Sequence, residues 1–114
     1  MSGQADVVVL LCTVPPERTE DFVDALLRER LIACANCIGP VQSRYVWKGN
    51  IEAAAETLLV MKTSRERVPA LEQRVAELHP YDVPELLVMG VDGGLEAYLG
   101  WVRESVASAD ESDS

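Results

Sequence analysis

The one histidine of the chain, His79, begins a short run of residues that could do chemistry. The run reads His-Pro-Tyr-Asp-Val-Pro-Glu at residues 79–85, so an imidazole, a phenol and two carboxylates lie close together in sequence. An imidazole can bind a metal ion or transfer a proton near neutral pH. Because Pro80 lacks a backbone N–H, the helical pattern before it must end here. The simpler alternative, which the residue types alone favour, is a connector in which His79 caps a helix.

A second candidate for chemistry is the pair Cys34 and Cys37, which forms a C-x-x-C motif. A structural zinc site needs about four ligands, and the sequence holds no second cysteine pair. A redox-active pair should open a helix, whose positive end lowers the pKa of the thiol, yet residues 33–41 have the pattern of a strand. We therefore interpret Cys37 as incidental. The alternative for Cys34 is a small buried residue packed under a helix.

The composition of the 114-residue chain suits one domain with one core, since 48% of the residues are hydrophobic. We expect this domain to cover residues 1–107 and residues 108–114 to form a disordered acidic tail. The net charge is −9, and −6 without the acidic residues of that tail, which argues against a nucleic-acid partner. No signal peptide or membrane-spanning run is visible, and three cysteines, an odd number, favour a reducing cytoplasm.

Hydrophobic patterns predict the elements that must position these residues. A continuous apolar run at residues 7–12 is typical of a central strand buried on both faces. Further strands are predicted at residues 57–63 and 85–91. Apolar stripes at helical spacing predict three helices, which cover roughly residues 16–31, 67–79 and 95–107.

The middle of the chain predicts a long hairpin. Apolar and polar residues alternate over residues 41–47, and Lys48-Gly49-Asn50 has the composition of a hairpin turn. Gly39-Pro40 indicates a bend or bulge in the first arm. Each arm then has about 15 residues, far more than the roughly six of a common strand, so the hairpin must project beyond its sheet. Its edge carries Tyr45 and Trp47, and such an edge calls for cover by a neighbouring copy.

The predicted order of elements defines an α+β fold. Two strand–helix–strand crossovers around a hairpin give a ferredoxin-like βαββαβ sandwich, with four antiparallel strands and two helices on one face. The long central hairpin and an extra C-terminal helix are additions to that minimum.

Six sequence blocks in this order resemble the CutA divalent-cation-tolerance family. The blocks are CTVPPE at residues 12–17, LIACAN at 31–36, SRYVWKG at 43–49 with Glu52 following, MKT at 61–63, HPYDVPE at 79–85 and YLGW at 98–101. The resemblance covers roughly residues 7–103. It implies a ferredoxin-like protomer close in shape to the signalling PII proteins, a cytoplasmic homotrimer, a link to tolerance of copper and other divalent ions, and no established catalytic reaction.

The resemblance also implies site residues. Cys34 matches the family cysteine and His79 the family histidine, which are the family's usual candidates for copper ligands. Thiolate and imidazole are ligands that copper prefers, although two ligands do not complete a site. Glu56, Asp82, Glu85 or a second subunit would have to add donors. An intersubunit cleft for a small ligand is the other candidate site, with these residues around it: Tyr45, Trp47, Glu56, Lys62, Tyr81 and Glu85.

Three functions compete on this evidence. The first is a trimeric divalent-metal protein without catalysis, with copper as the metal and no nucleic-acid or membrane partner. The second is a PII-like sensor or scaffold, whose cleft binds a small ligand and whose surface engages another protein. An enzyme comes third, because a Cys-His pair here lacks an orienting group and an oxyanion site. The fold alone does not decide between them.

Overall fold

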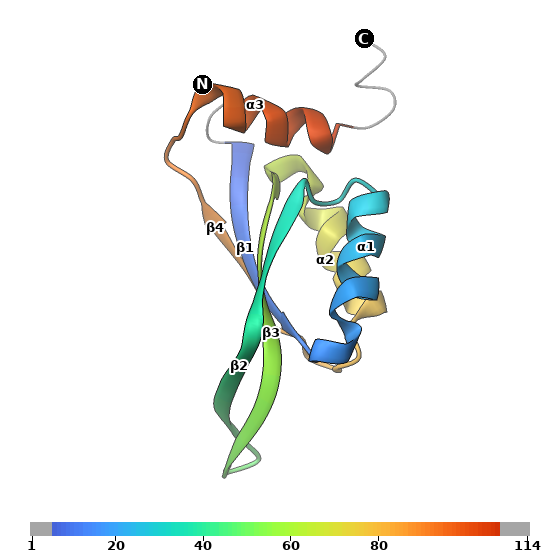
Figure 1. The fold of residues 1–114 in the computed structure, drawn as a ribbon, viewed down its shortest axis with the longest axis vertical. Coiled ribbons are helices and arrows are strands. Elements are labelled where there is room, and N and C mark those ends of the chain that lie inside the picture. Colours follow the sequence, from blue (N-terminus) through green and yellow to red (C-terminus); the bar gives the residue numbers. More distant parts are fainter. Residues whose placement is uncertain (1–5, 108–114) are drawn as a thin grey trace.

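The structure is a computed structural model that describes residues 6–107, and its centre is one four-stranded antiparallel sheet (Figure 1). The strands are β1 (Val7–Val14), β2 (Cys34–Trp47), β3 (Asn50–Ser64) and β4 (Leu86–Gly90), in the order β2-β3-β1-β4. This topology confirms the predicted ferredoxin-like fold. The predicted acidic tail lies outside the described residues.

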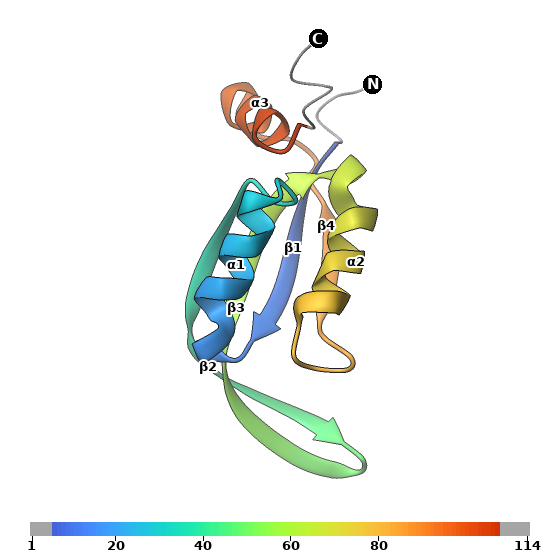
Figure 2. The ribbon, with the colours of Figure 1, turned by 90° about the vertical axis from the view of Figure 1, so that its right-hand side faces the viewer.

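Two helices cover one face of the sheet, as Figure 2 shows. They are α1 (Thr19–Arg28) and α2 (Val68–Leu78), and each follows a short 3-10 turn, Pro16–Arg18 or Arg65–Arg67. Alternate residues of β1, among them Val8, Leu10 and Cys12, lie fully buried beneath them. Because strand side chains alternate between the two faces, the remaining residues of β1 point away from the helices.

The prediction that β1 is buried on both faces is wrong within a single chain. Val9 and Leu11, on the face away from α1 and α2, are only partly buried. The third helix, α3 (Glu96–Ser105), crosses the end of the sheet and buries only Val7 there, in a small cluster with Leu99 and Val102. The rest of this face has no helix over it among residues 6–107, and we call it the open face (Figure 1). No helix in the described part of the chain is long and apolar enough to cross a membrane.

The hairpin of β2 and β3 projects beyond the sheet, as predicted. Strand β3 has 15 residues but pairs with β1 only over residues 57–64. Residues 50–56 pair with β2 alone, and the molecule is therefore elongated, with extents of 51 × 26 × 22 Å (Figure 1). Lys48 and Gly49 form the turn with φ of 51° and 81°, the left-handed conformation that tight hairpin turns require.

The predicted irregularity at Gly39-Pro40 is a β-bulge. The pairing of β2 with β3 shifts register between Ile38 and Val41, so β2 contains one extra residue there. Gly39 lies against the backbone of β3: a Cβ atom at this position would be 3.1 Å from the Glu56 carbonyl oxygen and 3.2 Å from Thr57 Cα. The bulge therefore leaves little room for a side chain at residue 39.

This packing predicts that Gly39→Ala destabilises the protein. The new methyl group must push backbone atoms aside, at a cost of about 1–3 kcal/mol in the free energy of unfolding. Urea unfolding at a fixed protein concentration measures this difference. Gly93→Ala is the matched control, because a Cβ atom there meets nothing within 4 Å. Equal stability of the two variants would contradict the close approach at Gly39.

Candidate functional site

His79 lies in a fully bonded corner between α2 and the end of β1. Pro80 stops the helix as predicted, and the His79 backbone N–H caps it by donating to the Val75 carbonyl oxygen at 2.8 Å. The imidazole is buried, with 6% of the residue exposed, and packs edge-on against the Phe22 ring. Its Nδ1 accepts the Tyr81 backbone N–H at 3.1 Å, and its Nε2 lies 2.7 Å from the Thr13 carbonyl oxygen.

These two contacts determine the tautomer of His79. A carbonyl oxygen can only accept and a backbone N–H can only donate. The proton of the neutral ring therefore sits on Nε2 and is donated to Thr13, while the Nδ1 lone pair is occupied by Tyr81. Neither nitrogen is open to a metal ion in this arrangement. In this conformation His79 caps α2, as the simpler interpretation of the sequence predicts.

Cys34 lies at the start of β2, on the open face. Its Sγ atom is 3.7 Å from the Tyr98 hydroxyl of α3, and this hydrogen bond raises the pKa of Tyr98 above its usual value. Cys34 is paired with Lys62 of β3, whose ammonium group donates to the Asn36 side-chain carbonyl. Lys62 thus has a neutral side-chain amide as its partner on the open face. Cys12 is buried, whereas Cys37 is exposed.

The structure does not bring Cys34 and His79 together within one chain. Cys34 is aligned through Lys62 with Val9, whereas His79 is bound at Thr13, four residues further along β1. This offset is about 13 Å at roughly 3.3 Å per residue. Moreover, His79 packs on the helix side against Phe22, whereas Cys34 faces the other way. Within residues 6–107, no three His, Cys, Asp or Glu side chains are placed to hold a metal ion. A single chain therefore does not offer a complete copper site.

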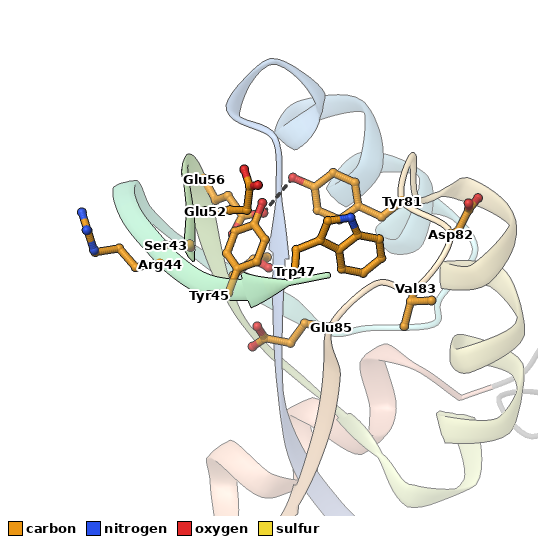
Figure 3. A pocket seen from close by; sticks show the side chains of 11 residues that line it. Ser43, Arg44, Tyr45, Trp47, Glu52, Glu56, Tyr81, Asp82, Val83 and Glu85 are labelled. Carbon is orange, nitrogen blue, oxygen red and sulfur yellow. Dashed lines mark hydrogen bonds between the residues drawn. The ribbon is translucent and has the colours of Figure 1, made fainter. Parts of the chain in front are cut away.

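The structure does bring five predicted cleft residues together around one cavity of about 670 Å³ (Figure 3). They come from the projecting part of the hairpin and from the 79–85 segment, and they are Tyr45, Trp47, Glu56, Tyr81 and Glu85. Lys62, the sixth predicted cleft residue, does not line the cavity. We call this space the hairpin cavity.

Six further residues line the hairpin cavity: Thr13, Ser43, Arg44, Glu52, Asp82 and Val83. Asp82 is a possible metal donor on sequence grounds, whereas Glu52 belongs to one of the six family blocks but is not among the predicted site residues. Its position could have been found from the turn, because a two-residue turn at Lys48-Gly49 fixes the register that sets Glu52 opposite Tyr45. Arg44 belongs to the other side of β2, and Figure 3 shows its side chain directed away from the aromatic rings.

A buried carboxylate links the two walls of the hairpin cavity. Glu56 on β3 is 6% exposed and accepts a hydrogen bond from the Tyr81 hydroxyl at 2.8 Å, drawn in Figure 3. Burial and this bond to a carboxylate raise the pKa of Tyr81 to about 12, because both disfavour the phenolate. Burial also raises the pKa of the nearby Cys12 thiol to about 12, with the charges of Glu85 and Glu56 adding to the effect. In both cases burial is the larger cause, and the nearby carboxylates add to it.

The bonded state of His79 predicts a structural role that can be measured. His79→Ala leaves a cavity beside Phe22 and an unpaired Thr13 carbonyl, and should lower the free energy of unfolding by about 3 kcal/mol. Gln73→Ala, at an exposed position of α2, should change it by less than about 0.5 kcal/mol. In the unaltered protein, ¹⁵N NMR should find the proton of the neutral ring on Nε2. A proton on Nδ1 would contradict the Tyr81 contact.

Comparison with known proteins agrees with this fold. Residues 8–105 match the family model described as CutA1 divalent ion tolerance protein. The chain is 41% identical over 98 residues to the divalent-cation tolerance protein CutA of Thermus thermophilus, covering 85% of this chain and 95% of that protein.

Solved structures give the same result. The crystal structure of CutA1 from Oryza sativa superposes with a TM-score of 0.88 at 33% identity, over 95% of this chain and 100% of the other. A structure described as the PII-like protein CutA from Nostoc, in apo form, has a TM-score of 0.83 at 38% identity, over 88% and 97% of the two chains. The family model spans nearly all of the described residues, and the chain therefore belongs to the CutA1 divalent ion tolerance family.

Proposed function

We propose that this protein is a non-catalytic, cytoplasmic homotrimer that acts in tolerance of divalent metal ions, with copper as the metal it binds. Membership of the divalent ion tolerance family supports the role in metal tolerance. The observation that carries the assembly is the open face of the sheet.

Much of the open face is apolar and has no cover among residues 6–107, which is unusual for a stable monomer. Leu87 and Met89 of β4 are 54% and 43% exposed, and Ile38 of β2 is 48% exposed. Between them lie partly buried apolar residues of the two central strands, among them Leu11 and Val60. A contiguous apolar surface of this kind marks a protein interface. Three copies can bury these faces against one another around a common axis, as in the trimer that the family resemblance implies.

The trimer predicts a mass that light scattering can measure. The purified chain should have about three times its 12.5 kDa mass at micromolar concentration. Leu87→Glu places a charge in the proposed interface, which costs several kcal/mol if the charge is buried, and should give monomers. Ala76→Glu introduces the same side chain at an exposed position of α2 and should leave the trimer intact. A monomeric unaltered chain would refute the proposal.

For copper, we propose Cys34 as the ligand within the chain, with the remaining donors from a neighbouring subunit. Cys34 is the partly exposed thiol of the family motif, and it lies on the face proposed to meet the other copies. A thiolate is the protein ligand that Cu(I) prefers. His79, the second predicted ligand, would first have to release Thr13 and Tyr81.

This proposal predicts distinct effects of three substitutions on Cu(I) affinity. Cys34→Ala should weaken binding at least about a hundredfold, because water does not take the place of a lost thiolate ligand on Cu(I). Cys37→Ala should leave affinity nearly unchanged, because Cys37 lies outside the family motif. His79→Ala, assayed in samples verified as folded, decides whether the histidine also ligates. Competition with a chromogenic Cu(I) chelator gives the affinities. Equal loss in Cys34→Ala and Cys37→Ala would instead assign the metal to the C-x-x-C pair.

A second candidate function is favoured by the hairpin cavity. A volume of about 670 Å³ is in the range of small-molecule sites. Thr13, on the open face of β1, also lines it, so the cavity lies at the border of the proposed interface. The protein could thus act as a small-ligand sensor whose binding site lies beside a subunit boundary, without a physiological metal role.

A further inference from the structure

The hairpin cavity has an excess of negative charge. Four carboxylates line it, from Glu52, Glu56, Asp82 and Glu85. Among residues 6–107, the one cation that lines it is Arg44, whose side chain points away from the rings in Figure 3. A ligand that fits this lining must carry positive charge, since an anion would be repelled by every acidic group in the wall.

Three aromatic rings supply the apolar part of the same wall. Tyr45, Trp47 and Tyr81 line the cavity and are 47%, 54% and 39% exposed in the single chain, although part of the Tyr45 and Trp47 surface is expected to meet a neighbouring copy. Large aromatic side chains left this open are suited to contact with a ligand, because burial of their faces is favourable. The face of an aromatic ring also attracts a cation placed over it. The rings therefore match an organic cation with an apolar body.

Glu56 shows that the cavity lacks a positive partner. The residue is only 6% exposed, and Tyr81 donates to just one of its two carboxylate oxygens, Oε2. Within the described part of the chain, no group donates to the other oxygen and no cation pairs with Glu56. A buried carboxylate without a cation is costly, and buried polar atoms are normally hydrogen-bonded. An ammonium group in the cavity would satisfy this oxygen.

A metal ion does not fit these observations. Divalent cations bind several oxygen ligands that converge within about 2.0–2.6 Å of one point. Among residues 6–107, no three acidic, His or Cys side chains converge in this way. In the view of Figure 3, the Glu52 and Glu85 carboxylates are drawn on opposite sides of the Tyr45 ring, and Glu56 is the acceptor of the Tyr81 hydroxyl. The acidic groups are spread along an aromatic surface.

We propose that the hairpin cavity binds a linear diamine or polyamine, with one ammonium group at Glu52 and Glu56, another toward Glu85, and the methylene chain across the aromatic rings. The inference deepens the second candidate function and rests on it. Separated charges joined by an apolar chain match separated carboxylates joined by an aromatic wall. No compact ion or neutral solute has that pattern.

Calorimetric titration of the full-length protein tests this inference, with 1,5-diaminopentane and spermidine as probes. 1,5-Pentanediol has the same chain length without charge, and n-pentylamine has one ammonium group. The diamine should bind at least about tenfold more tightly than the monoamine, the gain expected from a second charge-assisted hydrogen bond. The diol should not bind. Affinity should fall as salt is added, since ions screen such contacts.

Charge-matched variants locate the site. Glu56→Gln and Glu85→Gln should each weaken diamine binding about tenfold or more, because each removes one charged acceptor. Glu72→Gln makes the same change at an exposed position of α2, away from the cavity, and should have no effect. Trp47→Leu should weaken binding by loss of the ring face. If Glu56→Gln does not fold, Glu85→Gln and Trp47→Leu carry the test.

Each other outcome overturns the proposal. Absence of diamine binding refutes it directly. Equal binding of diamine and diol would remove the role of charge, and equal weakening in Glu72→Gln would reduce binding to general attraction by an acidic surface. Displacement of the diamine by equimolar Mg²⁺ would assign the carboxylates to a metal. Light scattering of the same samples tests for the trimer, and Cu(I) titration tests for copper binding. Loss of either property can therefore be distinguished from a lack of diamine binding in the cavity.

Discussion

The unequal lengths of β1 and β3 are the constraint on which the rest of the structure depends. Their ladder holds only over residues 57–64 of β3, where the apolar side chains of β1 and the two helices form the core. Beyond it, residues 50–56 have β2 as their sole strand neighbour. A two-stranded ribbon cannot bury much surface by itself. Its side chains are therefore available to face other parts of the chain, and the hairpin cavity forms where the ribbon meets the 79–85 segment.

The His79 corner determines where that second wall stands. One imidazole joins the end of β1 through Thr13 to the chain leaving α2 through the Tyr81 backbone. Tyr81 then reaches across to Glu56 on the hairpin. Three hydrogen bonds in sequence, two of them made by the buried imidazole, thus connect helix, sheet and ribbon. His79 therefore serves mainly to connect structural elements, because both of its ring nitrogens are hydrogen-bonded.

Much of the fold could be predicted because it follows from local patterns. The turn at Lys48-Gly49, the break at Pro80 and the bulge at Gly39-Pro40 depend on residue types with restricted or unusual backbone freedom. The open face could not be predicted, because the apolar run of β1 has the same pattern whether its second face meets a helix or another copy. The face of the sheet to which the Lys62 side chain points depends on the register of β3. The sequence alone does not determine that register to within one residue. The separation of Cys34 from His79 depends on tertiary packing that no spacing in the sequence encodes.

The bulge at Gly39-Pro40 also decides which residues the ribbon presents to the cavity. Before it, even-numbered residues of β2 lie on the open face, paired as Ile38 with Leu58. After it, odd-numbered residues share that side, so Tyr45 stands beside Glu52 while Arg44 turns outward. Loss of the extra residue would invert this order and bring a guanidinium inward in place of two aromatic rings. In evolution, one deleted codon at the bulge can therefore change the chemistry of this surface without any substitution in the ribbon.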